Sequence, residues 1–130
     1  MLSSLLLPKL RERFPNRGLC EGDSPDACAM FPGVHPGIRG VSIYDDGHEL
    51  TVCVDDLTHG HFAVYEEAMP ETEREQRIVD EVIEFLDDLF ADRIAVWGKQ
   101  NLGGGWYRVD VGRSNYSAGA QEFVWSGPRE

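Results

Sequence analysis

Four side chains of the kinds that bind metals lie close together near the middle of the chain. In sequence order they are Cys53, Asp55, His59 and His61. Thiolate, carboxylate and imidazole groups are ligands for zinc and iron. We assume that two antiparallel strands meet through a tight loop at 56–58. Asp55 then faces His59, and Cys53 faces His61 on the same side of the sheet. The sequence requires no cofactor, but this pattern predicts a candidate site for zinc or another divalent metal.

The same residues permit two other interpretations. Polar side chains that alternate along a strand are typical of the solvated face of a sheet. Cys53 beside His59 or His61 could instead form a thiolate–imidazole pair for nucleophilic catalysis. A half-buried cysteine in a strand is more often inert packing than a nucleophile. His35, which lies in an earlier turn segment, would supply a fifth ligand if the fold brings it to these strands.

The charge of the chain is concentrated in one segment. The 130 residues carry a net charge of −11. Residues 66–92 contain eleven acidic and two basic residues, so this segment accounts for −9 and the rest of the chain for −2. Binding to nucleic-acid phosphates requires positive charge, so the composition argues against a nucleic-acid partner.

Three aspartates at the end of the acidic segment are the charges that helix stability explains least well. Asp87, Asp88 and Asp92 crowd the C-terminal end of a predicted helix, where the helix dipole is already negative. Each costs about 0.3 kcal/mol or more unless Arg93 or another base compensates. Violations of this kind can mark a binding surface, so we predict that these residues bind a basic protein. Simple solvation of a charged helix face is the alternative.

The last third of the chain is rich in aromatic residues. Those between positions 97 and 125 are Trp97, Trp106, Tyr107, Tyr116, Phe123 and Trp125. Trp106 and Tyr107 are consecutive, so in a strand they point to opposite faces, and one of them would be exposed. An exposed Trp106 beside the glycines at 103–105 would suit the recognition of a ligand or a protein partner. Burial beneath a helix is the alternative.

Two helices are predicted to support these groups. Residues 72–91 carry apolar side chains at i, i+3, i+4 and i+7 spacing, and Thr72 and Glu75 form a capping box at the start. A shorter helix at 5–14 has one apolar face. That face consists of Leu6, Leu10 and Phe14.

A hairpin is the firmest strand prediction. Val41–Tyr44 and Leu50–Val54 alternate apolar and polar residues, and Asp46-Gly47 between them is a favoured two-residue turn. That turn would place Ile43 opposite Leu50, with the apolar side chains on one face of the pair.

The order of the predicted elements favours an α+β fold. Further strand patterns occur at 27–31, 59–65, 93–97, 106–111 and 122–125. Strands that precede and follow one long helix suit a mostly antiparallel sheet. We predict a single domain over residues 1–130. It is a two-layer sandwich in which a sheet of about five or six strands carries the short N-terminal and long central helices on one face.

The cysteines and the hydropathy pattern indicate a compartment. The three cysteines form no CxxC pair, as expected of free thiols in a reducing environment. The N-terminal segment lacks the features of a signal peptide, and no stretch approaches the roughly 20 apolar residues of a membrane span. These features predict a cytoplasmic protein without a membrane partner.

Three classes of function are compatible with the sequence. The leading prediction is a non-enzymatic interaction domain that binds a basic protein partner through its acidic helix. A metal-dependent enzyme that uses the Cys/Asp/His cluster is the second. A small-ligand module built on the C-terminal aromatic residues is the third.

Overall fold

The computed structural model describes residues 2–23, 25–99, 103–112 and 120–129. The helices are α1 (Leu2–Arg13) and α2 (Glu71–Phe90). The strands in chain order are β1 (Cys20–Glu21), β2 (Ala29–His35), β3 (Ile38–Asp45), β4 (Leu50–Val54), β5 (Thr58–Phe62), β6 (Ile94–Lys99), β7 (Gly103–Arg108), β8 (Glu122–Val124) and β9 (Gly127–Arg129).

These strands form two antiparallel sheets, and the predicted α+β sandwich class is confirmed. The first sheet has the order β1-β2-β3-β4-β5, and the second has the order β7-β6-β8-β9. The sequence had predicted one sheet of about five or six strands. The described strands divide into two sheets because β6 and β7 pack against β5 and the turn before it instead of extending its edge. Gly60 allows this approach, since a side chain there would overlap the ring of Trp106.

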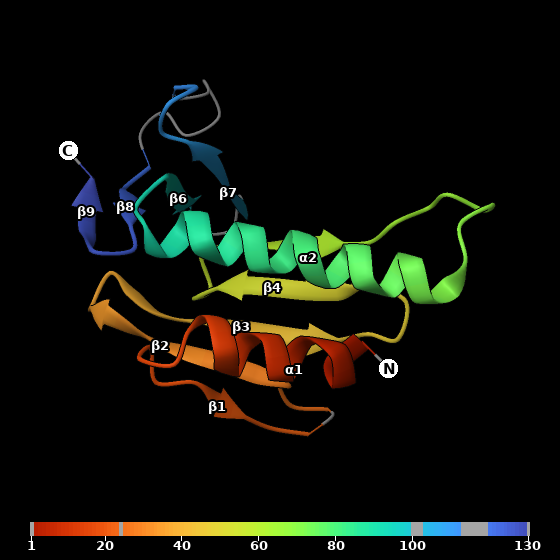
Figure 1. The fold of residues 1–130 in the computed structure, drawn as a ribbon. Helices are drawn as coiled ribbons and strands as arrows, with labels where there is room; N and C mark the ends of the chain where they lie inside the picture. The colour runs from red at the N-terminus through yellow and green to blue at the C-terminus, as the bar shows by residue number, and fades with distance from the viewer. Residues whose placement is uncertain (1, 24, 100–102, 113–119, 130) are drawn as a thin grey trace.

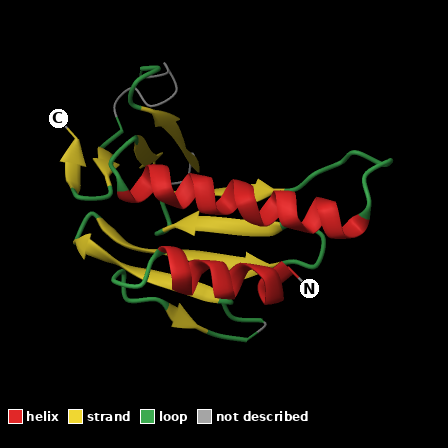
Figure 2. Ribbon diagram, in the orientation of Figure 1, coloured by secondary structure: helices red, strands yellow, loops and turns green. Residues whose placement is uncertain are grey.

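The two helices lie side by side across one face of the five-stranded sheet, as predicted (Figures 1 and 2). They run in the same direction, so their C-terminal ends lie at the same end of the molecule (Figure 1). Two ion pairs join them along their length, from Lys9 to Asp80 at 2.9 Å and from Arg13 to Asp87 at 2.8 Å. None of the described helices is both long enough and apolar enough to span a membrane.

The core lies between the helices and this sheet. It combines the predicted apolar face of α1, alternate residues of the strands and the stripe of α2. An aromatic group closes the core at the C-terminal ends of the helices. Phe14, Phe31 and Phe90 contact one another edge to face, with ring centroids 5.1–5.8 Å apart. Trp125, from the turn between β8 and β9, packs on Phe90 at 4.9 Å and ties the second sheet to this group.

The predicted hairpin forms, but its register was wrong by two residues. Asp45 pairs with Leu50, and Ile43 pairs with Val52. The loop therefore has four residues instead of two. Asp45 extends the strand because its carboxylate accepts hydrogen bonds from the amides of Gly47 at 2.9 Å and Ser3 at 2.8 Å. A shift of two residues keeps every side chain on its predicted face.

Two local predictions about α2 and β7 were also wrong. Helix α2 begins at Glu71, one residue earlier than predicted, and no side chain caps it, so Thr72 and Glu75 do not form a capping box. Strand β7 begins at Gly103 and ends at Arg108 instead of spanning 106–111, so the glycines at 103–105 form its first half, where Gly105 pairs with Trp97. Glycine is needed here because the Leu57 backbone lies against Gly104, where a side chain would clash.

Candidate functional site

The predicted metal ligands are placed by the pairing of β4 with β5, and the assumed register was wrong. Cys53 lies opposite His59, and His61 lies opposite Thr51. The turn has three residues, as assumed, but it begins one residue earlier, at Asp55, which adopts a left-handed conformation with φ 52°, so strand pairing resumes at Thr58.

Asp55 is held by an arginine and not by the histidines. Its side chain is only 6% exposed, and its carboxylate accepts hydrogen bonds from Nε and the backbone amide of Arg39, each at 2.8 Å. The Arg39 side chain holds the pKa of Asp55 well below its usual range. Asp55 therefore fixes the turn between β4 and β5 and the start of β3.

Cys53 is unsuited to act as a nucleophile. Burial raises the pKa of its thiol, and the charge of Asp46 raises it further. A reactive cysteine needs the opposite shift, toward the thiolate. Its cross-strand neighbour His59 is exposed, and the His59 ring contacts the His61 ring edge to face at 5.3 Å.

His61 joins a different group of metal-binding side chains. It lies with Asp46 and Glu49 of the hairpin loop, and one ligand atom from each lies within 4.8 Å of the others. The Nδ1 atom of His61 is 3.5 Å from a Glu49 oxygen and 3.1 Å from the hydroxyl of Thr51, which also bonds to Asp46. We call Asp46, Glu49 and His61 the outer-sheet cluster. Among the described residues it is the group of three that this geometry brings together.

The sequence missed this cluster because the loop register was needed to find it. Asp46 and Glu49 belong to a four-residue loop that the two-residue turn prediction had excluded. His35 lies elsewhere. Its Nδ1 accepts a hydrogen bond from the amide of Gly37 at 3.0 Å, and its ring stacks on Phe123 of β8. His35 thus joins the two sheets.

The three aspartates predicted to bind a partner are already engaged within the chain. Asp87 accepts hydrogen bonds from Nε and Nη2 of Arg13 at 3.0 and 2.8 Å. Asp88 forms ion pairs with Arg93 at 2.7 Å and with Arg108 at 2.6 Å. Asp92 accepts hydrogen bonds from the backbone amide and the hydroxyl of Ser126, at 3.0 and 2.5 Å. The compensating bases that the sequence left open are therefore present for Asp87 and Asp88, and they come from three separate segments, whereas Asp92 is bound by a serine.

Trp106 is half-buried and packs inside the fold. Its ring stacks on Phe85 of α2 with centroids 5.0 Å apart, and it covers Gly60 of β5. Tyr107 is also half-buried, and its hydroxyl donates to Glu122, which is 3% exposed. Trp106 and Tyr107 lie on opposite faces of β7, as the alternation along a strand predicts, but each side chain is half-buried against neighbouring residues.

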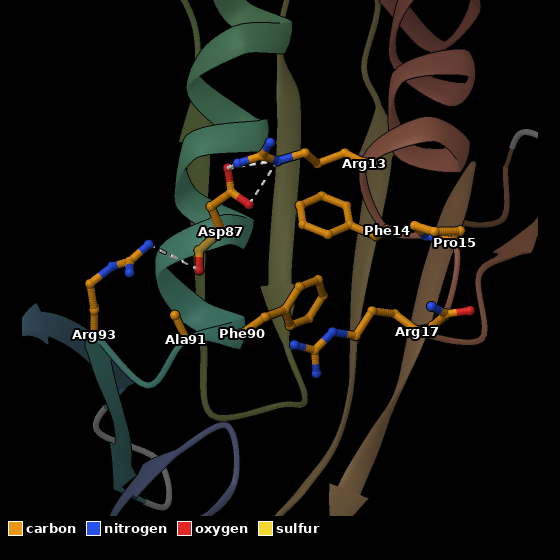
Figure 3. A pocket seen from close by; sticks show the side chains of 9 residues that line it. Arg13, Phe14, Pro15, Arg17, Asp87, Phe90, Ala91 and Arg93 are labelled. Carbon is orange, nitrogen blue, oxygen red and sulfur yellow. Dashed lines mark hydrogen bonds and ion pairs between the residues drawn. The ribbon is translucent and has the colours of Figure 1, made fainter.

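A cavity of about 560 Å³ lies where the two helices end (Figure 3). It is lined by Arg13, Phe14, Pro15, Asn16, Arg17, Asp87, Phe90, Ala91 and Arg93. We call it the helix-end cavity. Figure 3 shows Arg13 and Arg17 extending from the end of α1 toward α2, one on each side of Phe14. Three arginines and one aspartate give this lining two net positive charges, the reverse of the chain as a whole.

Aspartates of α2 hold two of these arginines in place. The carboxylate of Asp87 accepts hydrogen bonds from Nε and Nη2 of Arg13, and that of Asp88 accepts one from Nε of Arg93. The hydrogen bond from Arg93 holds the pKa of Asp88 below its usual value, and Arg108 adds to this effect. The Nη1 atoms of Arg13 and Arg93 have no acceptor in the part of the chain that the structure describes.

Arg17 differs from every other base in its surroundings. Its guanidinium lies over the ring of Phe90, 4.8 Å from the centroid. Of the lysine and arginine side chains that the structure describes, Arg17 alone has no acidic partner. This is notable in a chain with 23 acidic and 12 basic residues. Sequence reasoning missed the site because residues 13–17 and 87–93 are brought together only by the parallel packing of the helices.

Comparisons with known proteins identify no relative of this chain. No family model matches it, and neither a curated protein nor a solved structure shows significant similarity. The function must therefore be inferred from the geometry of these two sites.

Proposed function

We propose that the chain is a non-enzymatic binding module that binds an oxyanion in the helix-end cavity. One observation carries this proposal: the unpaired Arg17 guanidinium stands at a cavity whose other arginines are already oriented. Guanidinium groups bind carboxylates and phosphates through paired N–H donors. Arg13 and Arg93 are fixed by aspartates, so less side-chain entropy is lost when a ligand binds.

The described residues around Cys53 and His61 include no activated nucleophile, which supports binding over catalysis. The thiol of Cys53 is shifted away from the thiolate, as described above. Thr51 and Glu49 both contact the same nitrogen of His61. A hydroxyl–imidazole–carboxylate triad instead uses the two ring nitrogens separately, so these described residues do not form one.

The acidic helix supports a basic partner less well than the sequence indicated. A guanidinium or ammonium group of a partner would have to displace Arg13, Arg93 or Arg108 from Asp87 and Asp88. The exposed Glu81 and Glu84 remain available for such a contact. The predicted basic partner therefore stays a hypothesis, and the helix-end cavity is the better-supported site.

A structural role for the arginines is the main rival explanation. Both helices end at this cavity, and cations near a helix C-terminus offset its negative dipole, by about 0.3–1 kcal/mol each at an exposed site. Arg13 and Arg93 fit that role because they also bond to helix groups. Arg17 bonds to no helix carbonyl in the described structure, so it separates the two explanations.

Benzoate binding tests the proposal. We expect benzoate titrated into the protein at low salt to perturb the NMR signals of Arg17 and Ala91, and to do so less as salt is added. Arg17→Gln should weaken binding about tenfold, because it removes charge-assisted hydrogen bonds. Arg77→Gln is the matched control, since Arg77 is an exposed arginine of α2 paired with Glu66 outside the cavity. Equal loss in both variants would attribute the effect to net charge and contradict the proposal.

A second candidate function, the binding of a divalent cation, is favoured by the outer-sheet cluster. Asp46, Glu49 and His61 offer two carboxylates and one imidazole, a donor set suited to Zn²⁺ or Mn²⁺. Arginine and lysine ion pairs to these carboxylates do not occur among the described residues. Of the metal ligands predicted from the sequence, this candidate site keeps only His61. Asp46 and Glu49 take the place of Cys53, Asp55 and His59.

Zinc titration of the untagged protein tests this second candidate. Calorimetry should show one Zn²⁺ per chain, and His61→Ala should abolish it. His59→Ala is the matched control, because His59 is an exposed histidine two residues away on the same strand and lies outside the cluster. If His59→Ala loses as much affinity as His61→Ala, the cluster is not the site.

A further inference from the structure

We infer that the oxyanion bound in the helix-end cavity is the dianion of a phosphomonoester carried on an apolar group. This inference rests on the proposed function and names the chemical class of its ligand. It depends on three features of the cavity: its net charge, its unused donors and its apolar walls.

The charge of the lining matches a dianion better than a carboxylate. The lining has two net positive charges, and the neighbouring Asp88 is already shared between Arg93 and Arg108. A phosphomonoester has a charge of about −1.5 to −2 at neutral pH, whereas a carboxylate has a single negative charge. A monocarboxylate would leave part of the positive charge uncompensated.

The unused donors also outnumber what one carboxylate accepts. Arg17 contributes its whole guanidinium edge, and Arg13 and Arg93 each contribute Nη1. A carboxylate has two oxygens in one plane, while a phosphate presents three oxygens around a tetrahedral centre. Donors that come from α1, from the segment after it and from the segment after α2 approach from different directions, which suits the tetrahedral group.

The size and the walls of the cavity call for more than an inorganic ion. Its volume of about 560 Å³ lies within the range of small-molecule sites, roughly 300–1,000 Å³. Phe14 and Phe90 form an almost buried floor, and Pro15 and Ala91 stand exposed beside it. An apolar carrier could cover these residues while its phosphoryl group contacts the arginines.

Paired titrations with phenyl phosphate and benzoate test the inference, because both probes carry the same ring. At pH 7.5 and low salt, we expect calorimetry to show phenyl phosphate binding at least about tenfold more tightly than benzoate. The preference should shrink as the pH falls from 7 to 5, because the second phosphate ionisation lies near pH 6. Arg17→Gln should remove most of the preference, and Arg77→Gln should keep it.

The outcomes separate this inference from the proposed function. If benzoate binds as tightly as phenyl phosphate and Arg17→Gln weakens both, the oxyanion site stands and the phosphoryl assignment is overturned. If neither probe binds, the proposed function falls as well. Inorganic phosphate binding as tightly as phenyl phosphate would overturn the requirement for an apolar carrier.

Discussion

The helix-end cavity and the outer-sheet cluster both gather charged side chains, but the fold supports them differently. In the cavity, Arg13 and Arg93 are gripped by aspartates of α2, and Arg17 rests on an aromatic ring that belongs to the core. In the cluster, a hydroxyl and two loop carboxylates surround an exposed histidine. A cavity built on the core is oriented before its ligand arrives, whereas a cluster on a loop must be ordered by its ligand.

The largest effect on stability should come from truncating Phe90, which forms part of the floor of the helix-end cavity. Phe90 is 8% exposed and contacts Phe14, Phe31 and Trp125. We expect Phe90→Ala to lower the free energy of unfolding by about 3–5 kcal/mol, because it opens a void in the core. Urea denaturation measures this loss.

A surface aromatic provides the control for that variant. Tyr65 is 86% exposed, so Tyr65→Ala should change the free energy of unfolding by less than about 0.5 kcal/mol. A loss below about 1 kcal/mol for Phe90→Ala would show that the aromatic group is not the base on which the cavity stands.

Low pH should lower the stability of the fold around the helix-end cavity, because Asp88 becomes protonated. Its arginine partners hold the pKa of Asp88 below the ordinary value, so the unfolded chain binds this proton more readily than the folded chain. The stabilisation is therefore complete above about pH 5 and is lost as the pH falls below about 4 toward the lowered folded-state pKa.

The Asp88→Asn variant isolates this contribution. Urea denaturation between pH 7 and pH 2.5 should show a flatter loss of stability for Asp88→Asn than for the unsubstituted protein. Asp23→Asn, at an exposed aspartate without an ion pair in the described structure, should leave the slope unchanged. Parallel curves for all three proteins would mean that Asp88 does not link the cavity to pH.

Arg17 should matter for binding far more than for stability. Arg17→Gln removes one exposed cation–π contact, which contributes about 0.5–1 kcal/mol. A melting-temperature shift of a few degrees at most should accompany the weaker oxyanion binding. A stability loss above about 2 kcal/mol would favour the structural explanation for this arginine.

The smallest effect should come from the outer-sheet cluster. His61 is exposed, so His61→Ala should change the metal-free stability by less than about 0.5 kcal/mol. Thermal unfolding with and without Zn²⁺ should then separate His61→Ala from His59→Ala only when the metal is present. A marked loss of metal-free stability would mean that the cluster is a structural network.

The elements could be predicted from sequence more reliably than their pairing. The stripe of α2 and the alternation of β3 and β4 depend on local spacing, and all three elements formed within three residues of their predicted bounds. The registers of the two hairpins were wrong by two residues, because the choice was made by Asp45 bonding to Ser3 and by Asp55 bonding to Arg39. Neither contact is local in sequence.

The dependence on contacts between distant residues also explains why the candidate sites were predicted only in part. The histidines of β5 were recognised as metal-binding residues, but their carboxylate neighbours depended on the length of a loop. The aspartates at the end of α2 were recognised as unusual, and the reason is that they anchor arginines from distant segments. An unexplained charge in a sequence can thus indicate an internal partner as readily as an external one.

The pairing of α1 with α2 has a consequence for how the chain is made. The ion pair between Lys9 and Asp80 spans 71 positions. At synthesis rates of roughly 5–20 residues per second, α2 leaves the ribosome on the order of 10 s after α1. During that interval Leu6 and Leu10, which are fully covered in the finished fold, have no helix beside them. A nascent chain of this protein should therefore engage chaperones that bind apolar segments until residue 90 has emerged.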